Sequence, residues 1–125
     1  MTSLETRTLE EAPSVTAPDG SLVHILAACA RGSMARFALD PGCTSKAVRH
    51  RTVEELWYVI GGHGEMWRSG ETTIITSLAP GVSLSIPAGV SFQFRASGET
   101  PLHVIGVTMP PWPGMDEAET VPGYW

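Results

Sequence analysis

Apolar and polar residues alternate along two segments of the chain, 82–86 (VSLSI) and 90–96 (VSFQFRA). In the first segment Val82, Leu84 and Ile86 share one face, opposite two serines. In the second, apolar residues alternate with serine, glutamine and arginine. A period of two residues is typical of a β-strand that has one face in a core or pocket and the other in water. Both segments are therefore predicted to be half-buried strands.

The segment 55–60 (ELWYVI) is largely apolar on both faces. Trp57 and Val59 share one face with Glu55, and the opposite face carries only leucine, tyrosine and isoleucine. The segment 102–109 (LHVIGVTM) has a similar character. A strand that is apolar on both faces is central in a sheet or lies against another subunit.

Strand-like segments recur at short intervals between residues 21 and 109, and turns rich in Gly, Pro and Asp separate them. The expected strands span 21–30, 33–39, 46–50, 55–60, 64–68, 71–78, 82–86, 90–96 and 102–109. Thirteen glycines and ten prolines fit a chain that turns often and has no long helix. The pattern predicts an all-β sandwich or barrel.

The two ends of the chain differ from the middle. Residues 1–20 are polar and close on a turn, so we expect a loosely attached N-terminal arm before a barrel domain over 21–109. The C-terminal extension, 110–125, is rich in Pro and Trp. Its aromatic side chains carry large apolar areas that favour docking on the barrel or on a neighbouring copy. Trp112 is interpreted as an anchor for this tail, and a lid over the pocket is the alternative.

Composition and charge exclude several classes of partner. A chain of 125 residues fits one domain that buries enough surface to fold without disulfide or metal. Its net charge of −5, with only eight Lys and Arg, predicts no binding of nucleic acid, which needs a basic face. No apolar stretch is long enough to cross a membrane, so no membrane association is predicted. The acidic N-terminus has no signal-peptide core, and a cytoplasmic location is expected.

Two stretches resemble the paired sequence signatures of the cupin superfamily. The first signature is Gly, five residues, His-x-His, three or four residues, Glu, six residues and Gly. The chain has Gly42, Val48-Arg49-His50, Glu55 and Gly62 at these spacings. The second signature is Gly, five residues, Pro-x-Gly, two residues, His, three residues and Asn. The chain has Gly81, Pro87-Ala88-Gly89, Phe92 and Ala96 there.

The segment 55–64 between these stretches also resembles the hairpin that small cupins carry between their two motifs. The resemblance covers about residues 33 to 109. It implies a small single-domain (type-2) cupin, whose fold is a double-stranded β-helix, a jelly-roll-like barrel of two antiparallel sheets.

The resemblance also implies a metal site, of which this chain keeps half. Cupins that hold a metal use the two His and the Glu of the first motif and the His of the second. Here Val48 replaces the first His and Phe92 the last, while His50 and Glu55 match the other two positions. Two protein ligands hold a divalent metal weakly, so no tightly bound cofactor is predicted. The alternative is Fe, Mn, Ni or Zn on His50 and Glu55, with a third ligand such as His24 or His103 completing the site.

His50 and Glu55 are the candidate catalytic residues. The cupin resemblance places them on the inward face of the barrel, and the expected pocket residues around them are Val48, Trp57, Val59, Phe92, Phe94 and His103. A carboxyl among aromatic side chains should have a raised pKa, and an imidazole beside it can take or return a proton. The alternatives are a buried pair that only satisfies its own hydrogen bonds, and Glu54 in place of Glu55.

Three hypotheses about function follow. The first is a small-molecule-binding cupin that catalyses a metal-independent proton transfer, of isomerase or lyase type, with His50 and Glu55. The second is a metal-dependent enzyme such as an oxygenase, and the third is a ligand-binding module without catalysis. A homodimer is expected in each case, because the outer face of 55–60 would otherwise leave an apolar strip in water.

Overall fold

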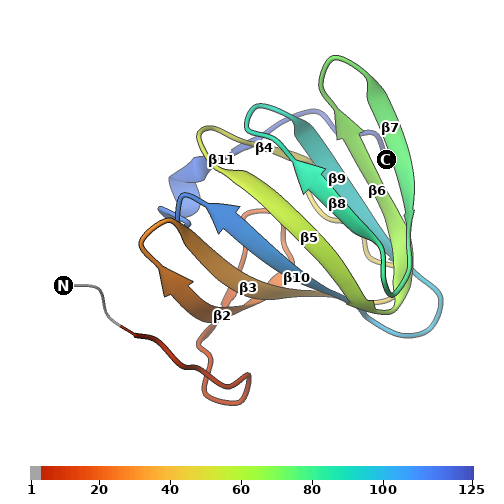
Figure 1. The fold of residues 1–125 in the computed structure, drawn as a ribbon. Coiled ribbons are helices and arrows are strands. Elements are labelled where there is room, and N and C mark those ends of the chain that lie inside the picture. The colour runs from red at the N-terminus through yellow and green to blue at the C-terminus, as the bar shows by residue number, and fades with distance from the viewer. Residues whose placement is uncertain (1–3) are drawn as a thin grey trace.

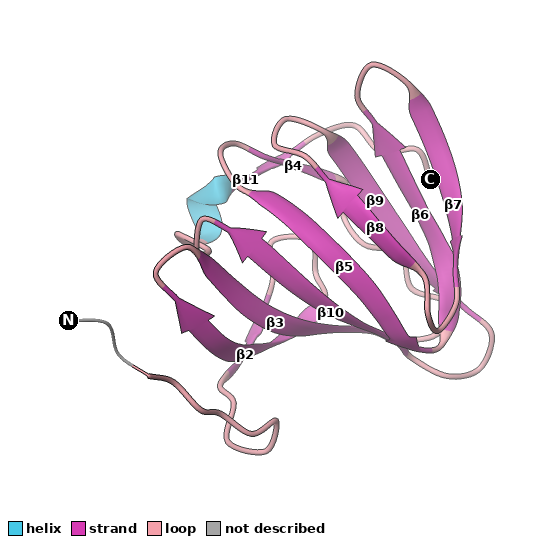
Figure 2. Ribbon diagram, viewed as in Figure 1, coloured by secondary structure: helices cyan, strands magenta, loops and turns pink. Residues whose placement is uncertain are grey.

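The computed structural model describes residues 4–125, and its regular secondary structure is antiparallel strands apart from one 3₁₀ turn (Figures 1 and 2). One sheet has six strands in the order β1 (Ser14–Thr16), β2 (Leu22–Cys29), β3 (Gly32–Leu39), β10 (Leu102–Met109), β5 (Glu54–Gly61) and β8 (Ser83–Ile86). The other has five, in the order β11 (Ala118–Thr120), β4 (Val48–His50), β9 (Ser91–Ser97), β6 (His63–Ser69) and β7 (Thr73–Leu78). The predicted all-β barrel of two antiparallel sheets is confirmed.

The core lies between the two sheets and is built from the inward faces of the strands. Along β5 the burial alternates, with Trp57 and Val59 nearly inaccessible and Leu56 and Tyr58 exposed. The second sheet contributes Met66, Phe92 and Phe94 among others to the same apolar cluster. Alternation in the sequence thus fixes which side chains enter the core, because successive residues of a strand point to opposite faces.

The nine strands expected from the sequence are all present within a residue or two of their predicted ends. The two short strands β1 and β11 and the 3₁₀ turn at Met115–Glu117 were not predicted. Strands of three residues carry no measurable period, and these two form because the chain returns to a sheet edge. β1 pairs with β2, and β11 pairs with β4.

Both terminal segments therefore lie against the barrel. Part of the predicted N-terminal arm extends the six-stranded sheet through β1, and part of the C-terminal extension continues the five-stranded sheet through β11. The last residues run beside β6 (Figure 1). Tyr124 stacks there on Trp67, with the ring centres 6.0 Å apart. Within residues 4–125, no helix has the length and apolar character needed to span a bilayer.

Candidate functional site

A cavity of about 310 Å³ lies between the sheets, and its walls are mostly apolar. Strands β2, β3, β5 and β10 form one wall, β4 and β9 form the other, and both terminal segments close the rim. The lining residues are Val15, Ala17, Pro18, Asp19, Val23, Ile25, Ala28, Ser33, Met34, Ala35, Phe37, Val48, His50, Glu55, Trp57, Phe92, Gly106, Thr108, Pro111, Trp112 and Ala118. A volume of this size falls at the small end of the range for small-molecule sites.

His50 and Glu55 meet inside this cavity from opposite sheets. His50 ends β4, Glu55 is the second residue of β5, and both are almost completely buried. The distance from His50 Nδ1 to Glu55 Oε1 is 3.7 Å, which is too long for a hydrogen bond. Within residues 4–125, His50 Nδ1 has no hydrogen-bond partner, so its lone pair or proton is free to face a ligand. The neighbouring Glu54 is exposed.

Glu55 is surrounded by aromatic rings and a single donor. Its Oε2 accepts a hydrogen bond of 2.7 Å from Trp57 Nε1. Burial raises the pKa of Glu55 to about 8, although the hydrogen bond from Trp57 acts in the opposite direction. Gly106 on the adjacent β10 makes room for this arrangement, because a Cβ there would lie 2.4 Å from the Phe37 ring and 2.7 Å from Glu55 Oε2.

His50 lies between two aromatic rings. The ring centres of Phe92 and Trp112 are each 5.1 Å from that of His50, in edge-to-face arrangements. Burial lowers the pKa of His50 to about 4, against the opposing effect of the Glu117 carboxylate. The short distance between His50 and Glu55 would allow an ion pair, but the two pKa shifts make both groups neutral near pH 7. The desolvation of two buried charges outweighs their attraction at 3.7 Å.

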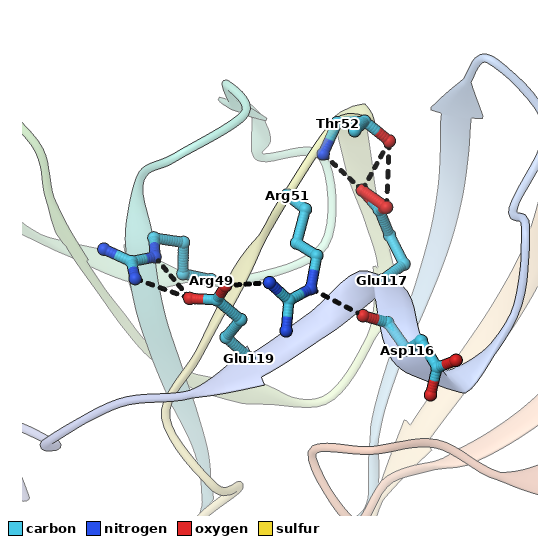
Figure 3. Close-up of polar contacts among 6 residues, drawn as sticks. All are labelled: Arg49, Arg51, Thr52, Asp116, Glu117 and Glu119. Atoms are coloured by element: carbon cyan, nitrogen blue, oxygen red, sulfur yellow. Dashed lines mark hydrogen bonds and ion pairs between the residues drawn. The ribbon is translucent and has the colours of Figure 1, made fainter.

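The loop that joins His50 to Glu55 is held by the C-terminal segment (Figure 3). The buried carboxylate of Glu117 accepts hydrogen bonds from the backbone N–H and hydroxyl of Thr52 and, at 2.9 Å, from the backbone N–H of Val53. Burial raises the pKa of Glu117, but these hydrogen bonds outweigh burial and the pKa lies below its usual value.

Trp112 forms part of the cavity wall. Its backbone N–H donates to Ser33 Oγ at 2.9 Å, and Ser33 Oγ also lies 2.6 Å from Thr108 Oγ1. The hydrogen bond to Ser33 holds the backbone of the tail at Trp112, and the Glu117 contacts hold the tail five residues further along the chain. The anchoring interpretation and the lid interpretation of Trp112 thus describe one arrangement, in which a docked tail supplies a wall of the pocket.

The sequence profile of the cupin domain matches residues 35–108, which is more than half of the chain. The chain belongs to the cupin family. The curated relative XanB, a xanthan biosynthesis protein of Xanthomonas campestris pv. campestris (strain B100), is 30% identical over 87 residues. That match covers 70% of this chain and 18% of XanB, so the cupin domain spans less than a fifth of that relative's length.

Solved structures show the same cupin fold. KdgF from Halomonas sp. is 21% identical, covers 85% of this chain and 94% of its own, and superposes with a TM-score of 0.72. Pac13 of Streptomyces, a nucleoside dehydratase, is 12% identical, covers 95% of this chain and 92% of its own, and has a TM-score of 0.75. Sequence identities at this level establish a shared fold only, so the reaction must be inferred from the residues of the site.

The cupin positions Val48, His50, Glu55 and Phe92 all line the cavity, and Val48 is the cross-strand partner of Phe92. The two positions where metal-binding cupins carry further His ligands therefore lie side by side and hold apolar side chains. The donors that remain at the cupin site are His50 and Glu55, and within residues 4–125 no third His, Cys, Asp or Glu groups with them as a metal site. This donor set does not fit a tightly held divalent metal, for which three protein ligands are usual.

Three residues expected in the pocket lie elsewhere. Val59 and Phe94 point inward from β5 and β9, but they are part of the packed core and not of the cavity lining. His103 lies on the face of β10 opposite the buried Leu102 and Val104, so its side chain points away from the cavity. Burial lowers the pKa of His103, and the nearby Arg36 and His24 lower it further.

Several lining residues were not predicted from the sequence. Phe37 stacks on Trp57 with ring centres 5.6 Å apart, and Asp19, Ser33 and Thr108 add polar atoms to the wall. None of them belongs to a cupin motif. The alternation along 33–39 could have pointed to Phe37, whereas nothing local marks the others.

Proposed function

We propose that this cupin domain binds a small molecule between its sheets and catalyses a metal-independent proton transfer, of isomerase or lyase type. The observation that supports this most is the juxtaposition of His50 and Glu55 in an apolar cavity, with their pKa values moved to about 4 and about 8. Near pH 7 the carboxyl carries a proton that it can donate and the imidazole is free to accept one. A pair with these protonation states suits concerted general acid–base catalysis.

The chemistry balances without an added reagent. His50 Nδ1 takes a proton from a carbon next to a carbonyl, while Glu55 gives its proton to the carbonyl oxygen and an enol forms. Where a second double bond is conjugated to the enol, His50 returns its proton to the far carbon and Glu55 takes back the enol proton, which gives an isomer and restores both groups. In a lyase reaction Glu55 protonates a departing hydroxyl, which leaves as water while His50 takes the proton from the adjacent carbon. The proton on His50 then passes to Glu55, 3.7 Å away, and restores both groups.

The comparisons support the scaffold for such chemistry but not a particular substrate. Pac13 has this fold and is a dehydratase, and a dehydratase catalyses an elimination of the lyase type. XanB is a xanthan biosynthesis protein, and the match spans only 18% of its length, so its role is not carried over to this chain.

Hydrogen–deuterium exchange tests the proposal directly. Small neutral ketones are incubated in D₂O with the protein, and loss of the proton signal next to the carbonyl is followed by NMR. His50→Gln and Glu55→Gln should each slow the enzyme-dependent exchange by about 100-fold or more. Glu54→Gln removes an adjacent but exposed carboxylate and should leave it unchanged.

The outcomes separate the readings. If the His50→Gln protein stays folded and exchanges at the wild-type rate, the acid–base pair is wrong. If ketones bind and none exchanges, the domain is a binding module without catalysis.

We also propose that two copies pair through the outer face of the six-stranded sheet. Leu56, Tyr58 and Ile60 are 51%, 51% and 41% exposed on this face of β5. Their neighbours on β10, opposite Leu56 and Tyr58, are Val107 and Ile105. Serines of β8 border the strip on one side. An apolar centre with a polar border is typical of a protein interface, and a two-fold axis through the strip would bury it against itself.

A further inference from the structure

The distribution of charge around the cavity restricts what the site can hold. All eight Lys and Arg residues of the chain fall within the described residues, and none of them lines the cavity. The ionisable side chains that do line it are Asp19, His50 and Glu55. A ligand that carried a negative charge would find two carboxyl groups and no cation.

The arginines closest in sequence to the site are already engaged elsewhere (Figure 3). Arg49 lies on the exposed face of β4, opposite the face that carries Val48 and His50, and its guanidinium contacts Glu119. Arg51 contacts the same carboxylate and donates to the backbone carbonyl of Asp116 at 2.9 Å. Neither guanidinium can turn to the cavity without leaving these partners.

The two carboxyl groups of the lining are themselves poorly solvated. Asp19 Oδ1 accepts hydrogen bonds from the backbone N–H and the hydroxyl of Ser21, at 2.9 and 2.6 Å, and Asp19 is 8% exposed. Burial raises the pKa of Asp19, as it does that of Glu55. An environment that disfavours its own carboxylates disfavours a carboxylate or phosphate of the ligand for the same reason, because no cation replaces the lost water.

The walls are flat and aromatic. The ring planes of Phe37 and Trp57 are inclined to each other by 24°, and the Trp57 ring also contacts Phe94 edge to face. Across the cavity, Phe92 and Trp112 flank His50. Planar rings gain contact with aromatic walls of this kind in stacked and edge-to-face arrangements.

We propose that the site selects an uncharged, planar and largely apolar molecule that presents one oxygen function to His50 and Glu55, and that it rejects anionic analogues of the same shape. This inference rests on the proposed function, in that it concerns the ligand of the same cavity. Its basis is the lining and the absence of a facing cation among residues 4–125, and not the reaction.

Displacement of a fluorescent probe tests the charge selection. N-phenylnaphthylamine, which is uncharged and aromatic, should bind in the cavity and gain fluorescence. Methyl naphthyl ketone and naphthoate have nearly the same shape and differ in charge, and each is titrated against the bound probe at pH 7. We expect the ketone to displace the probe at a concentration at least about tenfold lower than naphthoate, because naphthoate would be buried without a counter-charge.

A matched pair of variants places the selection in the cavity. Ile25 lines the cavity, lies on the same face of β2 as the buried Val23 and is 39% exposed, so Ile25→Arg brings a guanidinium to the mouth of the cavity without burying it. Ile75 on β7 is 42% exposed and does not line the cavity. Ile25→Arg should improve displacement by naphthoate at least about tenfold, and Ile75→Arg should leave it unchanged.

Equal displacement by the ketone and by naphthoate in the wild-type protein would overturn the charge selection, and the exchange experiment on His50 and Glu55 would still decide the function. Equal gains in Ile25→Arg and Ile75→Arg would also overturn it, because the effect would then come from net charge. Failure of the probe and of both naphthyl compounds to bind would contradict the proposed ligand class, and exchange of the small ketones would still decide the function.

Discussion

At the residue scale, the surroundings of Glu55 and His50 move their pKa values apart. Each side chain is almost fully buried, and burial favours the neutral form of both an acid and a base. Trp57 and Glu117 oppose these shifts but do not cancel them. The same burial that prepares the pair for proton transfer therefore also makes the stability of the fold depend on pH.

Stability should fall as the pH rises above 6.5. The raised pKa of Glu55 means that the folded protein holds a proton that the unfolded chain releases, so stability is lost between pH 4.5 and about 8. The lowered pKa of His50 has the opposite sign and acts between about 4 and 6.5, so it no longer offsets Glu55 above that range. The loss from pH 6.5 to 8 should be about 2 kcal/mol.

Urea unfolding at pH 6.5 and 8.5 measures this loss in the wild-type protein and in Glu55→Gln. The variant cannot ionise at this position and should lose less stability over the interval. Equal losses in both proteins would mean that Glu55 is not held protonated in the fold.

Restoring the missing cupin ligands should create a metal site. Val48 and Phe92 are cross-strand partners beside His50, so Val48→His with Phe92→His should place three imidazoles near Glu55. The double substitution should destabilise the apoprotein by a few kcal/mol, because Phe92 is nearly inaccessible in the core. Added Zn²⁺, Mn²⁺ or Ni²⁺ should then raise its melting temperature through linkage.

Wild type and the single variant Val48→His serve as controls, and both should respond much less to metal. A double variant that folds but gains no metal-dependent stability would show that the two motifs are aligned wrongly here.

At the scale of elements, the C-terminal segment and the loop between β4 and β5 act as one unit. Glu117 binds the loop, Trp112 flanks His50, and β11 pairs with β4 so that Ala118 lies opposite His50. The loop is short and connects the two candidate catalytic residues. Its position, and with it the approach of His50 to Glu55, depends on the tail.

Glu117→Ala should lower the free energy of unfolding by about 2–3 kcal/mol, because it leaves the backbone N–H groups of Thr52 and Val53 without their acceptor. The matched control is Glu119→Ala, which removes a carboxylate two residues away whose partners Arg49 and Arg51 are exposed. That substitution should change stability little. Chemical denaturation of both variants makes the comparison, and equal effects would contradict a special role for Glu117.

At the scale of the whole molecule, the barrel carries two apolar surfaces that face in opposite directions. The inner surface forms the core and the cavity, while the outer strip on β5 and β10 is exposed in the single chain. The sequence of β5 left two interpretations, a central strand or one against another subunit. In the fold, β5 lies between β10 and β8, and its outer face has no cover from the described part of the chain.

Sedimentation should detect a dimer at micromolar concentration. Tyr58→Arg places a charge in the centre of the strip and should give a monomer, because an unpaired charge would be buried in the interface. Ile75→Arg introduces the same charge on β7 of the other sheet and should leave the dimer intact. A wild-type monomer at this concentration would end the dimer proposal.

The strands and the cupin motifs could be predicted because they depend on neighbours in sequence. The resemblance to the cupin motifs placed Val48, His50 and Glu55 inward. Alternation, which decides the side of a strand that each residue faces, placed Trp57 and Phe92 inward. It could not distinguish a side chain that lines the cavity from one packed beside it, and Val59 and Phe94 fell on the packed side.

The tertiary structure decided which segments distant in sequence meet around the cavity, because the pattern of a single strand carries no information about them. Val15 and Asp19, near the start of the chain, and Trp112, near its end, complete the cavity wall because both terminal segments return to the barrel. The Glu117 carboxylate binds the backbone N–H of Val53, which lies 64 residues away in sequence. The protonation states of His50 and Glu55 were also decided here, because the removal of water from a side chain depends on every segment that packs around it. The sequence by itself thus determined the fold and the inward face of the pair, and tertiary packing determined the pocket and the charge that the pair carries.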